Sequence, residues 1–307
     1  MEQTTLHDVE PSDYDVIIAG SGAGGLLTAL ALTANGKRVL VVEKESRLGG
    51  VWHGYWVDGF RVDQGLHVIT RVTRGAFTRF MRTYLPTLPR FVLHEGWYFR
   101  VHDRVGTIPT SVGQTLQWPL TGLRGRLGLA RIGAKIKTMK LEEMKRYKDI
   151  TFLEFMKRNN VTNQVILDVM QSAIYMAAGV GIDEASAYEA LRTLKDTDKE
   201  SSKLETIKKL LFGSTEYDEG YVIGGMQYLV EEVVKAINGA YLLNAPVRRI
   251  TERDGRVRSI TVGDTVIEHD CVVSNIPLWE MPRIVDSDRQ ETIDFFKRWS
   301  HMRITRG

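Results

Sequence analysis

The sequence has little of what defines several large classes of protein. Cys271 is the only cysteine among 307 residues, which excludes an internal disulfide framework and suits a reducing compartment. No apolar run reaches the roughly 18 residues of a membrane-spanning helix, and the polar, acidic N-terminus does not resemble a secretory signal. The net charge of +3, from 41 basic and 38 acidic side chains, is too small to indicate nucleic-acid binding. We therefore expect a cytoplasmic globular protein of one or two domains.

Glycine, by contrast, is concentrated in a stretch near the N-terminus. Val16–Ala19 is a short run of mainly β-branched residues, typical of a buried parallel strand. The next six residues fit the spacing G-x-G-x-x-G. In this motif the first glycine permits a tight turn, the second lets the backbone approach a pyrophosphate, and the third lets a helix pack closely on the strand. The predicted phosphate-binding residues are Gly20, Ser21, Gly22, Ala23, Gly24 and Gly25.

The residues after this turn complete a dinucleotide-binding pattern. A helix is predicted over Leu26–Thr33, ended by Asn35-Gly36, and its N-terminus directs backbone N–H groups toward phosphates. A second predicted strand, Arg38–Val42, ends at Glu43, whose carboxylate can accept hydrogen bonds from an adenosine ribose. An ordinary glycine-rich turn is the alternative for the glycines alone. Because strand, turn, helix, second strand and acid are in register, the pattern favours a dinucleotide site.

A second glycine pair follows the acidic residue. The segment KESRLGG comes directly after Glu43, and its glycines leave no side chain between the backbone and a pyrophosphate. Arg47 in this segment supplies a cation near that charge. Asp58-Gly59 predicts a hairpin turn between two short alternating segments. Asp63–His67 is then expected to return the chain toward the nucleotide.

These motifs resemble the FAD-binding N-terminus of the phytoene desaturase, protoporphyrinogen oxidase and flavin amine oxidase superfamily. The resemblance lies in E-K-x-x-R-x-G-G downstream of the glycine turn, followed by D-G-F-x-x-D-x-G-x-H, and it implies FAD rather than NAD. The implied cofactor-binding residues beyond the turn are Glu43 at the adenosine ribose, with Lys44 after it, Arg47, Gly49 and Gly50 along the pyrophosphate and ribityl chain, Gly65 and His67 beside the isoalloxazine ring, and Val247, which meets the adenine through its backbone. Many members carry arginine directly after the glycine pair, where this chain has Val51.

The resemblance also implies a domain plan. We expect an α/β fold, in which a three-layer Rossmann-like FAD-binding domain, with a parallel sheet and a β-meander, is interrupted by a mainly helical substrate domain. The predicted segments are a leader (1–13), the first FAD-binding segment (14–74), the helical substrate domain (75–219), the second FAD-binding segment (220–277) and the start of a second substrate segment (278–307). Members of the superfamily usually continue further, so the resemblance implies a C-terminally truncated member.

The segment 121–148 is helical in pattern and basic. It contains nine Lys or Arg residues against two acids, and its apolar residues recur at helical spacing. This apolar stripe consists of Leu129, Ile132, Ile136 and Met139. One interpretation is a helix that lies with this stripe on an anionic membrane, as a peripheral contact through which a lipophilic substrate enters. The other is a helix packed against its own domain with a solvated basic face.

Two functions remain open at this stage. The first is an FAD-dependent oxidoreductase that oxidises or desaturates a hydrophobic small molecule, with an isoprenoid or carotenoid precursor favoured over a porphyrinogen or an amine. In this family, as the resemblance implies, the flavin accepts the hydride and the protein positions the substrate. The second is a non-catalytic prenyl- or lipid-binding protein on the same scaffold, like the Rab GDP-dissociation inhibitors. The sequence shows no Ser-His-Asp set, zinc-like spacing or paired carboxylates, so it predicts no metal site and identifies no catalytic residue.

Five further side chains have two interpretations each. His67 lies near the flavin ring or is an ordinary loop histidine. Trp52 and Trp56 line a hydrophobic substrate channel or pack in a core, as aromatic residues of a hairpin more often do. Tyr175 and Met176 face a substrate cavity or, again, a core. The sequence alone does not separate these interpretations.

Overall fold

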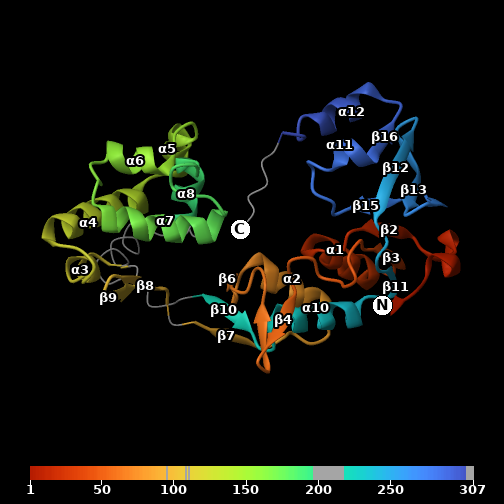
Figure 1. The fold of residues 1–307 in the computed structure, drawn as a ribbon, viewed down its shortest axis with the longest axis horizontal. Helices are drawn as coiled ribbons and strands as arrows, with labels where there is room; N and C mark the ends of the chain where they lie inside the picture. The colour runs from red at the N-terminus through yellow and green to blue at the C-terminus, as the bar shows by residue number, and fades with distance from the viewer. Residues whose placement is uncertain (95, 108, 110, 196–217, 302–307) are drawn as a thin grey trace. The chain divides into compact units, whose positions relative to one another are not determined.

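The computed structural model describes residues 1–94, 96–107, 109, 111–195 and 218–301 of the chain. Contacts between residues divide the chain into two compact units. The described residues of the sheet unit are 1–94 and 218–301, and those of the helical unit are 96–107, 109 and 111–195 (Figure 1). Among the described residues, no helix combines the length and the apolar character that crossing a membrane requires.

A five-stranded parallel sheet forms the centre of the sheet unit, with the strand order β1-β11-β3-β2-β15. Its strands are β1 (Glu2–Gln3), β2 (Val16–Ala19), β3 (Val39–Val42), β11 (Gly239–Leu242) and β15 (Val272–Ser274). Every residue of β2 and β3 is buried, and Ile18 of one strand lies opposite Val41 of the other. Burial on both faces explains why these strands are continuous apolar runs in the sequence rather than alternating ones.

Helices cover one face of this sheet, and a second sheet covers the other. The covering elements are α1 (Ala23–Ala34), α10 (Gly225–Ala236), β12 (Val247–Arg253), β13 (Arg256–Val262), β14 (Thr265–Glu268) and β16 (Val285–Ser287). Leu26 of α1 and Leu229 of α10 share a buried cluster with Ile18, whereas Ile17 shares the opposite cluster with Ile260 of β13. The strands β12, β13 and β14 form an antiparallel meander. The predicted three-layer, Rossmann-like α/β fold is therefore confirmed.

The first 13 residues belong to the sheet unit, so the prediction of a loose leader is wrong. Strand β1 extends the parallel sheet beyond β11, and two short 3-10 helices follow at Leu6–Asp8 and Pro11–Asp13. Both residues of β1 are polar and exposed. A strand this short and without apolar alternation leaves no periodic signal, and the neighbouring strand alone defines it.

The sheet unit also extends further along the chain than predicted. Gly75, the predicted start of the substrate domain, is the N-cap of α2 (Ala76–Tyr84), and Met81 of α2 is fully buried in the same cluster as α1. Strand β7 (Phe91–Leu93) pairs with β10 (Glu219–Val222). The described part of the predicted second substrate segment, 278–301, lies in this unit too, because β16 pairs with β12. The last six residues of that segment lie outside the described residues. The remaining elements of the unit are β4 (Gly54–Val57), β5 (Phe60–Asp63), β6 (Ile69–Thr70), α11 (Met281–Ile284) and α12 (Gln290–Lys297).

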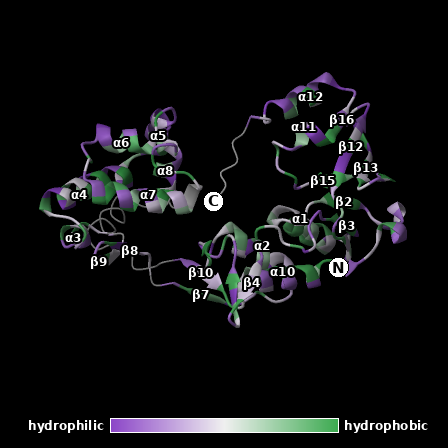
Figure 2. Ribbon diagram, viewed as in Figure 1, coloured by the Kyte–Doolittle hydropathy of each residue, from purple (hydrophilic) through white to green (hydrophobic). Residues whose placement is uncertain are grey.

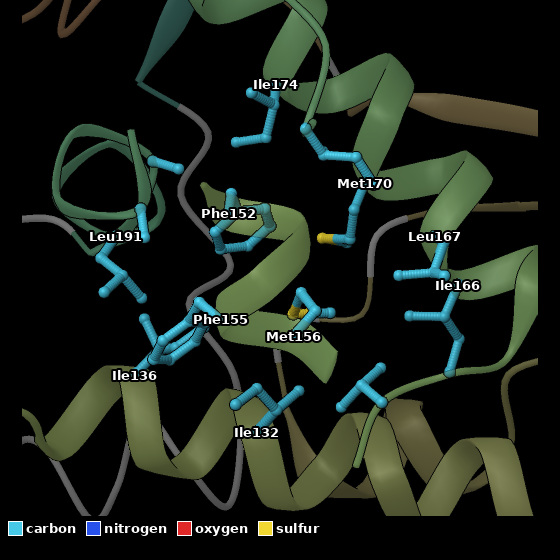
Figure 3. Packing of buried hydrophobic residues seen from close by; sticks show 14 of the residues in the cluster. Ile132, Ile136, Phe152, Phe155, Met156, Ile166, Leu167, Met170, Ile174 and Leu191 are labelled. Atoms are coloured by element: carbon cyan, nitrogen blue, oxygen red, sulfur yellow. The ribbon is translucent and has the colours of Figure 1, made fainter. Parts of the chain in front are cut away.

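The described part of the helical unit is a hairpin followed by helices. Its elements are β8 (Tyr98–Val101), β9 (Arg104–Thr107), α3 (Val112–Leu116), α4 (Leu123–Thr138), α5 (Leu141–Met144), the 3-10 helix η3 (Lys145–Tyr147), α6 (Phe152–Arg158), α7 (Gln164–Ala178) and α8 (Ala187–Leu194). Phe152, Phe155 and Met156 of α6 project between α4 and α7, toward Ile136 and Met170 (Figure 3). The unit is therefore held together by one apolar interior.

One face of the basic segment 121–148 contributes to this interior. Figure 2 shows hydrophobic stretches of α4 beside hydrophilic ones. The predicted stripe of Leu129, Ile132, Ile136 and Met139 is buried, and it packs in one cluster with the aromatic side chains of α6. The stripe is therefore packed against its own unit, as in the second interpretation. A peripheral membrane contact of this segment stays a prediction.

Candidate functional site

Three parts of the chain meet at one edge of the parallel sheet. Gly20 directly follows β2, Glu43 follows β3 and Asn275 follows β15, so all three lie at the carboxyl ends of parallel strands. Strand β2 lies between β3 on one side and the edge strand β15 on the other. In open α/β sheets, ligands bind outside the carboxyl ends of the strands where the strand order reverses in this way.

Close backbone contacts require the glycines of the first turn. A Cβ atom at Gly25 would overlap the carbonyl oxygen of Gly20, so α1 packs this tightly on the turn only with glycine there. Gly22 is the N-cap of α1, and no side-chain cap is formed at this helix end among the described residues. The first-turn N–H groups of α1 therefore present their partial positive charge to an anion.

Glu43 is buried, with 5% of its surface exposed, and its carboxylate is held by the glycine turn. Its Oε2 accepts hydrogen bonds from the N–H group of Ser21 at 2.8 Å and from the Ser21 hydroxyl at 2.5 Å. Its Oε1 accepts one from the N–H group of Glu45 at 3.0 Å. An ionised carboxylate offers about four acceptor positions, so one on Oε1 remains for a hydroxyl group of a ligand.

Ser21 also ties the second glycine pair to the first turn. The N–H group of Gly49 lies 3.1 Å from the Ser21 carbonyl oxygen and 3.2 Å from its hydroxyl oxygen. Gly50 packs so closely that a Cβ atom on it would lie 3.0 Å from the Cα atom of Gly22. The two predicted glycine motifs therefore form one continuous backbone surface at the start of α1.

The second segment of the sheet unit reaches Glu43 through the backbone. The N–H group of Ala245 donates to the Glu43 carbonyl oxygen at 2.8 Å, and Val247 begins β12 two residues later. Val247 is therefore two residues along the chain from a direct backbone contact of Glu43, the residue predicted to hold the ribose. Lys44 has a different setting, because its ammonium pairs with Glu45 at 3.5 Å and both side chains are largely exposed.

The chain returns to the second glycine pair after the hairpin. A Cβ atom at Gly65 would lie 2.5 Å from the carbonyl oxygen of Val51, the residue after the pair. Val51 itself is 64% exposed. His67 is exposed, with its Nδ1 atom 3.1 Å from the Gly65 carbonyl oxygen. Its ring stacks on Tyr221 with the ring centres 6.2 Å apart and the planes 9° from parallel.

The sequence analysis missed Asn275, whose carboxamide lies against the glycine turn. A Cβ atom at Gly22 would be 2.7 Å from Asn275 Nδ2, and one at Gly24 would be 2.5 Å from Oδ1. The backbone N–H group of Asn275 donates to the Ala19 carbonyl oxygen at 2.8 Å, which continues the pairing of β15 with β2. No motif marks Asn275 in the sequence, because the pairing of β15 with β2 is what brings it to the turn.

The sequence analysis also missed the group of side chains around Arg47. Its Nη2 atom lies 2.6 Å from Nε2 of His53. His53 contacts the Gly50 carbonyl oxygen through Nδ1 and the side-chain oxygen of Gln64 through Nε2. No motif marks His53 or Gln64, because their contacts arise where the hairpin folds back beside the glycine pair.

Burial separates the aromatic and methionine side chains that had two interpretations. Trp52 is buried and meets the edge of Phe77 with the ring centres 5.7 Å apart, so its core interpretation is confirmed. Trp56 on the hairpin is 67% exposed, and Tyr175 and Met176 on α7 are about half exposed. For these three residues the core interpretation is wrong.

A small apolar cavity of about 70 Å³ lies in the helical unit. Trp118, Leu129, Val169 and Met170 are among its lining residues, which come from α4, α7 and the end of α3. Pockets for drug-sized ligands usually enclose about 300–1,000 Å³. This cavity is therefore too small to hold an isoprenoid chain.

The chain matches a known protein family over most of its length. Residues 23–299 match the model of a protein family described as flavin containing amine oxidoreductase. The matched range begins at the start of α1, includes Glu43 and Asn275, and runs through both units. The match therefore covers most of the chain rather than the glycine motif alone.

Individual relatives match shorter regions. Human all-trans-retinol 13,14-reductase is 42% identical over 71 residues, which are 23% of this chain and 12% of the reductase. A chloroplastic prolycopene isomerase of an Oncidium hybrid cultivar is 34% identical over 105 residues, 30% of this chain and 18% of the isomerase. The crystal structure of an oxidoreductase from Methanosarcina mazei has a TM-score of 0.68 at 17% identity, over 94% of this chain and 65% of that one. The chain thus spans less than two thirds of each of these proteins.

Proposed function

Because the chain belongs to the flavin-containing amine oxidoreductase family, we propose that its sheet unit binds FAD and that the protein is an FAD-dependent oxidoreductase. The observation that carries this proposal is the position of the uncapped N-terminus of α1 beside the Glu43 carboxylate, at neighbouring strand ends. A helix end that attracts an anion, next to an acceptor for a hydroxyl group, matches the pyrophosphate and ribose of a dinucleotide.

The residues around the turn fit the successive parts of FAD. The first-turn N–H groups of α1 would hold the pyrophosphate, with Arg47 as the nearby cation. The remaining acceptor position on Oε1 of Glu43 would receive a ribose hydroxyl group, and Val247 would lie at the adenine. Gly65 and His67 would lie toward the isoalloxazine end.

The redox chemistry would come from the cofactor, since a flavin accepts a hydride from its substrate. The protein would hold the cofactor at the sheet edge and orient the C–C or C–N bond to be oxidised or desaturated. The backbone groups and the buried carboxylate of this edge are suited to that binding role because packing fixes them before a ligand arrives.

An isoprenoid- or carotenoid-like molecule is the substrate class that the similarities support most. Two relatives are named for retinol and prolycopene, and both align with this chain at more than 30% identity. The family description instead points to an amine, and a porphyrinogen is a third candidate. A protein that binds a prenyl group or lipid without catalysis is the alternative from another functional class.

The test is a titration of FAD, and separately of NAD, into the purified full chain after removal of any bound ligand. We expect FAD to bind more tightly than NAD. We expect Glu43→Gln to weaken FAD binding roughly tenfold, because a charge-assisted hydrogen bond is lost. Glu268→Gln is the matched control, since its side chain is exposed on β14 of the second sheet, and it should leave the affinity unchanged.

Two results would contradict the proposal. Tighter binding of NAD than of FAD would contradict the choice of cofactor. Equal FAD affinities of the wild type and Glu43→Gln would contradict the role of this edge. Binding of a prenylated peptide by a chain that takes up no flavin would favour the non-catalytic alternative.

A further inference from the structure

The imidazole of His53 joins separate parts of the candidate site. His53 is 9% exposed and lies directly before β4. Its Nδ1 atom contacts the carbonyl oxygen of Gly50, and its Nε2 atom lies 2.6 Å from Nη2 of Arg47. Gln64 follows β5, and its side chain also contacts Nε2, while its N–H group donates to the His53 carbonyl oxygen at 3.0 Å. The ring is therefore fixed by the hairpin on one side and contacts the glycine-pair loop on the other.

These partners determine the tautomer of His53. A carbonyl oxygen accepts hydrogen bonds and a guanidinium group donates them, so Nδ1 carries the hydrogen toward Gly50 and Nε2 accepts from Arg47. The one acceptor position of Nε2 is then used by Arg47, and the side chain of Gln64 lies beside the same nitrogen. This arrangement satisfies both ring nitrogens.

The contacts of His53 fix two groups beside the start of α1, the guanidinium of Arg47 and the peptide of Gly50. Arg47 has a long, flexible side chain on a loop, and the bond to His53 fixes its guanidinium in one position at the cost of one of its five donors. The bond to Gly50 fixes the peptide of a residue that packs against Gly22, the N-cap of α1. His53 therefore holds a cation and a stretch of backbone at the place where an anion is expected to bind.

We propose that His53 is a positioning residue for the pyrophosphate of the bound dinucleotide. It acts through Arg47 and Gly50 and does not itself contact the phosphates. Their pre-organisation lowers the entropy lost on binding. This role rests on the FAD site proposed above, and it adds a residue that no motif of the sequence contains.

The test is a double-mutant cycle in FAD affinity, measured on the purified full chain with Arg47→Ala, His53→Ala and the double variant. We expect each single variant to weaken FAD binding about tenfold, and the double variant to weaken it by clearly less than the product of the two losses, because His53 acts in part through that guanidinium. His53→Gln is expected to recover much of the loss, since its amide oxygen can accept from Arg47. His7→Ala, at an exposed histidine of the 3-10 helix Leu6–Asp8, is the matched control.

The cycle separates a positioning role from a merely structural one. If His53 only stabilised the fold, the thermal midpoint of the ligand-free protein would fall and the losses in FAD affinity would multiply to about a hundredfold in the double variant. That result, or an unchanged affinity in His53→Ala, would overturn the positioning role while leaving the FAD site standing. Failure of the wild type to bind FAD would overturn the proposed function and this role together.

Discussion

The glycine turn of the sheet unit and the interior of the helical unit are built from opposite kinds of contact. At the turn, backbone atoms approach one another where glycine leaves room, so a Cβ atom at Gly25 would overlap the Gly20 carbonyl oxygen. In the helical unit, large side chains fill the interior, and Phe152 and Phe155 have no exposed surface. Gly128 of α4 shows the contrast, because a Cβ atom there would meet nothing within 4 Å.

This contrast explains why one unit carries a recognisable motif and the other does not. A ligand bound by backbone groups restricts the sequence to a few residue types at fixed spacing. An apolar interior, in comparison, accepts many combinations of similar volume. The sequence of the sheet unit therefore indicates the class of ligand. The sequence of the helical unit shows only apolar periodicity, which does not indicate a substrate.

The largest change in stability is expected in the helical unit. Phe155→Ala should lower the free energy of unfolding by about 3–5 kcal/mol, because it empties a fully buried position of α6. The FAD affinity of the folded protein should stay the same, since Phe155 belongs to the other unit. Urea denaturation and an FAD titration measure the two quantities. Leu127→Ala, at a half-exposed position of α4, is the control and should cost less than about 0.5 kcal/mol.

Gly25→Ala, in the sheet unit, should lower both the stability of the protein and its FAD affinity. The added methyl group overlaps backbone rather than a flexible side chain, so we expect a loss of about 3 kcal/mol, at the upper end of the usual cost of overpacking. FAD binding should be lost as well, because α1 must move away from the turn. Thermal unfolding with and without FAD provides the measurement, and wild-type behaviour in both would refute the close contact.

Replacement of Gly128 by alanine should raise the free energy of unfolding, whereas replacement of Gly25 lowers it. Gly128→Ala introduces a better helix former into α4 where there is open space, so the free energy of unfolding should rise by about 0.5–1 kcal/mol. Chemical denaturation in parallel with Gly25→Ala makes the comparison direct. Destabilisation by both changes would mean that the two glycines are not under different constraints.

The smallest expected effect lies at the opposite end of β2 from the glycine turn. The N–H group of Arg38, at 2.8 Å, and the ammonium of Lys37, at 3.2 Å, lower the pKa of Asp15. A lowered folded-state pKa stabilises the fold above the ordinary carboxyl pKa of about 3.9, and this stabilisation is lost as the pH falls through the lowered pKa. Asp15→Asn should therefore have a slightly lower thermal midpoint than the wild type at neutral pH, and the difference should disappear in acid. A difference independent of pH would exclude the ionised carboxylate as its cause.

The sequence was sufficient to predict the elements whose residues carry their own signal. β2, β3 and α1 were predictable because two-sided burial and the glycine spacing restrict the residue types there. β1 was not, because two exposed polar residues form a strand only through pairing with β11. The boundary at Gly75 was wrong for a related reason. An amphipathic helix such as α2 shows that it has a buried face, but not which unit buries it.

The same distinction applies to the residues of the candidate site. Glu43 and the glycines were predictable because they follow the strand and turn in sequence. Asn275 and His53 were missed because packing alone brings them to the turn, one from the far end of the sheet unit and one from the hairpin. Side-chain partners that are distant in sequence leave no fixed spacing for a motif to record.

The visible absorption spectrum of the purified protein tests the central claim most directly, when combined with identification of any compound that denaturation releases. We predict a flavin spectrum and the release of FAD, as an FAD-binding sheet unit requires. Release of NAD without any flavin would contradict the account.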